Sequence, residues 1–135
     1  MSSKLTFVIE DNTVTSDLLT HKISKIQGME AKQFSSAEEA FAKISDQPDF
    51  ILLDNFLDGV NGVEFIDKFL NACPAAKIIV LSNQATVSKY EEDALKEKAI
   101  DWFKKDGDGI KAALDKIQKL SQASVTSRDS YNINL

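Results

Sequence analysis

Short apolar runs alternate along the chain with segments whose apolar residues recur at helical spacing. Five runs have the length of β-strands, the second being the weakest: residues 5–9, 30–34, 50–53, 78–81 and 99–103. Five segments have helical periodicity: residues 13–27, 36–47, 63–73, 87–97 and a last helix with Ile110, Leu114 and Ile117 on one stripe. A strand followed by a helix therefore recurs five times.

This alternation predicts an α/β fold in which a doubly wound, five-stranded parallel sheet lies between two layers of helices. The runs at 50–53 and 78–81 lack polar residues, which is typical of strands buried on both faces. We expect one domain over residues 4–121. Residues 122–135 are rich in Ser, Thr and Asn and have no sustained helical period, so they are predicted to be a flexible tail or the start of a linker.

Composition agrees with one folded domain and excludes several classes of protein. The chain has 135 residues, of which 43% are hydrophobic, and its net charge of −5 disfavours direct nucleic-acid binding. The single cysteine, Cys73, excludes an internal disulfide, and the single histidine, His21, excludes a histidine-dependent triad. Neither a signal peptide nor an apolar run of membrane length is present, so we expect a cytoplasmic protein without membrane contact.

Polar side chains follow four of the predicted strands, at the edge of an α/β sheet where ligands usually bind. Glu10 and Asp11 follow the first strand, Asp54 the third, Ser82 the fourth and Lys105 the fifth. Simpler interpretations exist for some of them taken singly. Asp11 fits a helix cap, Ser82 fits a turn, and the neighbouring Lys104 fits the inward position as well as Lys105 does.

The joint placement of these groups predicts phosphoryl chemistry. Three clustered carboxylates repel one another unless a cation lies among them, and oxygen ligands suit Mg²⁺. Asp54 would then be both a metal ligand and the nucleophile that forms an aspartyl phosphate. Mg²⁺, the Lys105 amine and the Ser82 hydroxyl would each cover one phosphoryl oxygen.

Four stretches carry a family resemblance when they are taken in order. They are Val8-Ile9-Glu10-Asp11-Asn12, Ile51-Leu52-Leu53-Asp54, Ile78-Ile79-Val80-Leu81-Ser82 and Ala99-Ile100-Asp101-Trp102-Phe103-Lys104-Lys105-Asp106, with Gly62 eight residues after Asp54. Over about residues 4–120 the chain resembles a response-regulator receiver domain of two-component signalling, of the chemotaxis-regulator type. The resemblance implies a flavodoxin-like fold with strand order 2-1-3-4-5.

The resemblance also implies a Mg²⁺ site. Asp54 corresponds to the phosphorylated aspartate and Asp11 to a direct metal ligand. Glu10 corresponds to the acid that acts through metal-bound water. The backbone carbonyl of Phe56 completes the protein ligands.

Three further residues correspond to the phosphoryl-binding and switching groups of the family. Ser82 matches the hydroxyl that moves toward the phosphoryl group, and Lys105, rather than Lys104, matches the lysine that binds it. Trp102 matches an aromatic side chain that rotates between exposed and buried positions, although plain core packing fits Trp102 equally well.

The resemblance implies partners as well. The phosphoryl donor would be a sensor histidine kinase or a histidine phosphotransfer protein. Phosphorylation would change the surface of the fourth helix, fifth strand and fifth helix, which would alter binding to a downstream effector protein or support a homodimer. The domain would catalyse only its own phosphorylation and dephosphorylation, so it is not expected to be an enzyme.

Three residues near the site are candidate modulators of the phosphoryl chemistry, and two of them depart from the family pattern. Asp58 replaces a frequent proline, and Asn83 replaces a small residue beside the phosphoryl group. Phe56 stands where family members tune dephosphorylation. Two alternatives stay open: a degenerate receiver that binds partners without phosphorylation, and, less favoured, a haloacid-dehalogenase-like phosphatase. A nucleotide-binding Rossmann domain is disfavoured because no glycine-rich turn follows the first strand.

Overall fold

The computed structural model describes residues 3–54, 62–82 and 100–133. Its strands form one parallel sheet with the order β2-β1-β3-β4-β5. The strands are β1 (Lys4–Ile9), β2 (Met29–Phe34), β3 (Phe50–Asp54), β4 (Lys77–Ser82) and β5 (Asp101–Lys104). The predicted strand order and the doubly wound, flavodoxin-like architecture are therefore confirmed.

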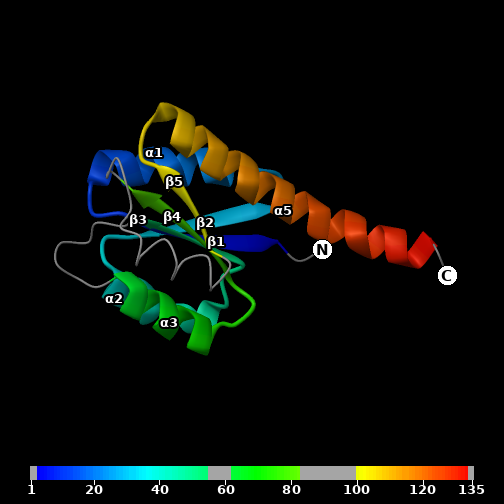
Figure 1. Cartoon of the computed structure of the whole chain (residues 1–135), viewed down its shortest axis with the longest axis horizontal. Coiled ribbons are helices and arrows are strands. Elements are labelled where there is room, and N and C mark those ends of the chain that lie inside the picture. Colours follow the sequence, from blue (N-terminus) through cyan, green and yellow to red (C-terminus); the bar gives the residue numbers. More distant parts are fainter. Residues whose placement is uncertain (1–2, 55–61, 83–99, 134–135) are drawn as a thin grey trace.

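Helices cover both faces of the sheet (Figure 1). They are α1 (Thr13–Ser24), α2 (Ala37–Phe41), the short 3₁₀ helix η1 (Ile44–Asp46), α3 (Gly62–Ala72) and α5 (Gly107–Ile133). Helices α1 and α5 lie on one face, and α2 and α3 lie on the other (Figure 1). The predicted helix over residues 87–97 falls outside the described residues. Within the part that the structure describes, no helix combines the length and apolarity needed to cross a membrane.

Two apolar layers hold the sheet between the helices, because neighbouring side chains on a strand point to opposite faces. Phe7 and Ile9 of β1 face α2 and α3, where they join a cluster that contains the fully buried Phe69. Val8 of the same strand faces α1 and α5 and joins a cluster that contains Ile117. The absence of polar residues from the central strands follows from this two-sided burial.

Two predicted helices are shorter than expected. The helix predicted over 13–27 ends at Ser24, and the chain turns into β2 at Gly28, whose φ of 75° lies in the left-handed region that glycine tolerates. The helix predicted over 36–47 ends at Phe41 and is followed by the separate turn η1. Ser36 is the N-cap of α2 as predicted, since its side chain accepts a hydrogen bond from the Glu39 backbone N–H at 3.2 Å.

The end of the chain differs from the prediction in secondary structure. Helix α5 does not stop near residue 121 but continues to Ile133, so its 27 residues span about 40 Å and its last turns project beyond the sheet (Figure 1). Residues 122–133 contain neither glycine nor proline to end a helix. Adding a turn to an existing helix avoids the cost of nucleation, which a search for apolar periodicity does not take into account.

Candidate functional site

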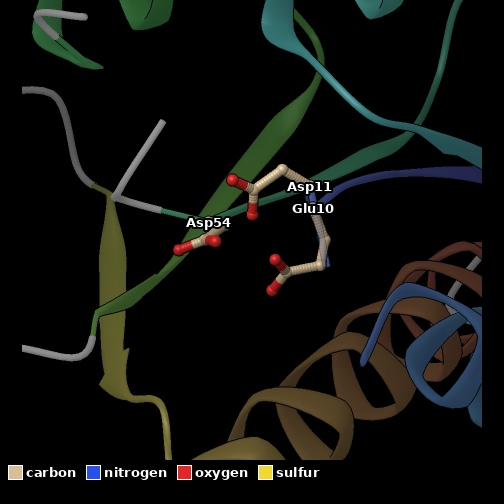
Figure 2. Close-up of side chains that lie close together, drawn as sticks. All are labelled: Glu10, Asp11 and Asp54. Atoms are coloured by element: carbon tan, nitrogen blue, oxygen red, sulfur yellow. The ribbon is translucent and has the colours of Figure 1, made fainter. Parts of the chain in front are cut away.

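Three carboxylates meet at the carboxyl edge of the sheet. Glu10 and Asp11 follow β1, and Asp54 is the last residue of β3, the strand that pairs with β1. One carboxylate oxygen from each lies within 4.8 Å of the other two (Figure 2). Parallel neighbouring strands end at the same edge, so residues 43 positions apart in sequence converge as predicted.

Glu10 is almost completely buried, at 2% exposure, and its two oxygens differ. Oε2 accepts a hydrogen bond from the backbone N–H of Asn12 at 3.0 Å. Oε1 lies 2.5 Å from Lys105 Nζ, but without hydrogen-bond geometry. Lys105 is thus the ion-pair partner that compensates the burial of this oxygen.

Asp11 is exposed at the mouth of the cluster and does not cap α1. The N-cap is Asn12, whose side-chain oxygen accepts from the Thr15 backbone N–H at 2.9 Å. The interpretation of Asp11 as a helix cap is therefore wrong, and its carboxylate is directed toward the other two acids (Figure 2).

Asp54 and Lys105 form a close ion pair. Asp54 is 4% exposed, and its Oδ2 accepts a hydrogen bond from Lys105 Nζ at 3.0 Å. Burial disfavours the charged ammonium, but the carboxylates of Glu10 and Asp54 outweigh burial and raise the pKa of Lys105 above its ordinary value. Lys104, at the end of β5, is exposed, so Lys105 is the lysine that enters the cluster.

The turn between β5 and α5 positions Lys105. Its backbone N–H donates to the Ser82 carbonyl at 2.7 Å, which ties it to the end of β4. Asp106 directly precedes α5, and its side chain accepts a hydrogen bond from the Gly109 backbone N–H at 2.7 Å. A Cβ at Gly109 would lie 1.7 Å from the Lys104 carbonyl oxygen, so only glycine fits this close approach.

Of the remaining predicted site residues, the structure describes two, Ser82 and Trp102. Ser82 is fully buried at the end of β4, where it pairs with Lys104 of β5. Trp102 of β5 is half-buried and packs against the core on the α2 and α3 face. The candidate modulators Phe56, Asp58 and Asn83 lie outside the described residues.

The described residues fit a divalent cation. Glu10, Asp11 and Asp54 carry three negative charges against the one positive charge of Lys105, which leaves a formal charge of −2 in the cluster. The buried Glu10 Oε1 already faces one cation, because it lies 2.5 Å from the Lys105 ammonium. Carboxylate oxygens with this charge are the donor set that Mg²⁺ prefers.

Sequence reasoning overlooked Asn12, which shapes the site through its main chain and side chain. Its backbone N–H holds Glu10, while its side chain begins α1. A signal for the second role was present, because asparagine directly before a helix is a favoured N-cap. The hydrogen bond to Glu10 has no such signal, since it depends on the turn of the backbone.

Comparisons with known proteins agree with this geometry. The family model described as the response regulator receiver domain matches residues 6–118. A protein-glutamate methylesterase/protein-glutamine glutaminase of Leptospira interrogans is 28% identical over 130 residues, which cover 94% of this chain and 37% of that protein. The chain thus spans little more than a third of the length of this curated relative.

Solved structures share the fold at lower sequence identity. The CheY-like receiver domain protein of Methanospirillum hungatei has a TM-score of 0.78 at 21% identity, covering 93% of this chain and 99% of that one. A Burkholderia pseudomallei response regulator, described with a phosphorylated aspartic acid, calcium ion and citrate, has a TM-score of 0.69 at 23% identity, covering 93% and 75%. These structures show the shared fold, and the family match over residues 6–118 shows that the chain belongs to the response regulator receiver domain family.

Proposed function

We propose that this domain accepts a phosphoryl group on Asp54 in a Mg²⁺-dependent reaction. The observation that carries the proposal is the buried Asp54 carboxylate, which lies 3.0 Å from the Lys105 ammonium and beside the carboxylates of Glu10 and Asp11. Asp11, Asp54 and the Phe56 backbone carbonyl would hold the metal directly, and Glu10 would hold it through water. When bound, Mg²⁺ neutralises charge on the phosphoryl oxygens.

The chain's own residues supply the rest of the chemistry. An ionised Asp54 oxygen attacks phosphorus and forms the O–P bond, while the P–N bond to the donor imidazole breaks. The electron pair of the broken bond and a proton remain with the imidazole, and Asp54 itself has no proton to lose. Lys105 balances charge on one phosphoryl oxygen, and the Ser82 hydroxyl donates to another.

The donor class proposed is a sensor histidine kinase or a histidine phosphotransfer protein, and the recipient of the signal is a downstream effector protein. The new charge of about −1.5 to −2 would draw Ser82 toward it and shift Trp102 and the surface formed by the fourth helix, β5 and α5, which also suits a homodimer. We place the receiver domain at residues 4–121 and assign residues 122–135 to a tail or linker.

We further propose a cytoplasmic location without nucleic-acid or membrane contact, and no turnover of an external substrate by this domain. The Leptospira relative carries the name of a methylesterase and glutaminase, and this chain covers 37% of it. An esterase activity would therefore need chain beyond the receiver domain. This follows from the described site, whose nucleophile is a carboxylate at a sheet edge rather than an activated hydroxyl.

Intact-mass measurement tests the proposal. Wild-type protein, Asp54→Asn and the control Asp115→Asn, whose residue is exposed on α5, are each incubated with Mg²⁺ and acetyl phosphate. Wild type and the control should gain one phosphoryl group, and Asp54→Asn should gain none. An adduct of equal yield on Asp54→Asn, or no adduct on wild type in the presence of bound Mg²⁺, would contradict the proposal and favour a degenerate receiver.

A further inference from the structure

Lys105 holds the carboxylates of two different strands at once. Its Nζ lies 2.5 Å from Glu10 Oε1, beyond the end of β1, and 3.0 Å from Asp54 Oδ2, at the end of β3. Its side chain is only 13% exposed, against 1% for Glu10 and 3% for Asp54. The ammonium therefore serves as a cation inside the acidic cluster, and its charge is poorly screened by solvent.

Both contacts of Lys105 are close ion pairs. The contact with Asp54 is hydrogen-bonded, and the contact with Glu10 Oε1 is the shorter of the two. The ammonium therefore compensates the charge of both carboxylates while no metal is bound. Release of either carboxylate would need movement of the Lys105 side chain only, since the Lys105 backbone is bonded to the Ser82 carbonyl.

We propose that Lys105 is the built-in counter-ion of the metal-free cluster, and that a divalent cation must compete with it for Glu10 and Asp54. This inference rests on the proposed function for the existence of the metal site, and it assigns to Lys105 a role before any phosphoryl group arrives. Lys105 stabilises the metal-free domain and weakens cation binding. Its positive charge therefore sets the Mg²⁺ concentration at which the domain becomes competent.

The test is calorimetric titration of Mg²⁺ into wild type, Lys105→Gln, Lys105→Arg and Lys104→Gln at pH 8. Lys104→Gln is a matched control, because it removes the same charge from the neighbouring residue, whose side chain is exposed. The Kd of Lys105→Gln for Mg²⁺ should fall at least about tenfold, given the coupling measured between close charge pairs. Lys105→Arg keeps the charge and should stay near wild type, and Lys104→Gln should change within about twofold.

Urea unfolding supplies a second readout that does not depend on phosphorylation. Without metal, Lys105→Gln should unfold at lower urea than Lys104→Gln, and saturating Mg²⁺ should stabilise it more than it stabilises wild type. Unchanged or weaker Mg²⁺ binding by Lys105→Gln, with binding intact in wild type, would overturn this inference alone. Failure of every variant to bind Mg²⁺ would overturn both this inference and the proposed function.

Discussion

Among the described residues Asp11 has no ion-pair partner at the mouth of the cluster, which makes Asp11→Asn the sharpest stability test. The two acids beside Asp11, Glu10 and Asp54, and the Lys105 that pairs with them sum to a formal charge of −1. At 4.8 Å, the upper limit of the distances between these oxygens, a single repulsion of this size is about 0.9 kcal/mol in a medium like bulk water and about 3.5 kcal/mol at an effective dielectric constant of 20. Asp11 is exposed, so the lower figure applies, and Asp11→Asn should raise the free energy of unfolding by about 1 kcal/mol without metal.

Bound Mg²⁺ should make wild type the more stable of the two proteins, although Asp11→Asn is the more stable one without metal. Wild type at 100 times its Kd for Mg²⁺ would gain about 2.7 kcal/mol by mass action. Asp11→Asn should gain far less, since it lacks one proposed ligand. The variant should thus be the more stable protein in EDTA and the less stable one in saturating Mg²⁺.

The assay is urea unfolding followed by the fluorescence of Trp102, the only tryptophan of the chain, with circular dichroism as a second probe. The matched control is Asp17→Asn, an exposed position on α1 away from the cluster, which should change stability little in either condition. About 1 M salt should shrink the difference seen in EDTA, because it screens the repulsion. A destabilised Asp11→Asn in EDTA would refute the electrostatic reasoning, since its side chain would then have a favourable role.

Three further predictions concern the cap, the core and pH. Asn12→Ala should lower the free energy of unfolding by about 1 kcal/mol, because the Thr15 N–H loses its acceptor, and Asn12→Ser should restore most of it in the same urea assay. Phe69→Ala should cost about 3–5 kcal/mol, as its ring is fully buried, whereas Val14→Ala at 77% exposure should change little. Lys105 has a raised pKa in the folded protein, so its ion pairs contribute their full stability below the ordinary lysine pKa of about 10.4. That contribution is lost as the pH rises through the higher pKa that Lys105 has in the folded state. In EDTA, the difference in urea midpoint between wild type and Lys105→Gln should therefore narrow above pH 10.4, and a constant difference would count against the ion pair.

Secondary structure was predictable where local pattern and burial agree. The apolar runs of β3 and β4 required strands buried on both sides, and the structure contains them. Strand β2 was the weakest prediction, because Glu30, Lys32 and Gln33 interrupt any apolar pattern. It forms through its parallel pairing with β1, from Lys4 with Met29 to Ile9 with Phe34, and that pairing is a tertiary contact.

The positions at which helices end agreed less well with the apolar spacing in the sequence. Helix α2 is short although apolar spacing continued to Ile44, because the chain turns through η1 and Gln47 adopts a φ of 58°. Helix α5 is long although no apolar stripe demanded it beyond residue 121. Both cases show that periodicity reports which residues could be buried, while the stop of a helix depends on local backbone geometry.

The sequence by itself determined which charged side chains are present and at which edge of the sheet they lie. Glu10, Asp11, Asp54 and Lys105 each follow an apolar run, and parallel strands bring such positions together. Only the tertiary structure decided which partner each charge has. Lys105 rather than Lys104 enters the cluster, Asn12 rather than Asp11 caps the helix, and Glu10 pairs with Lys105. Adjacent residues differ in these roles by the direction of a single side chain, and that direction is set by contacts between strands far apart in the chain.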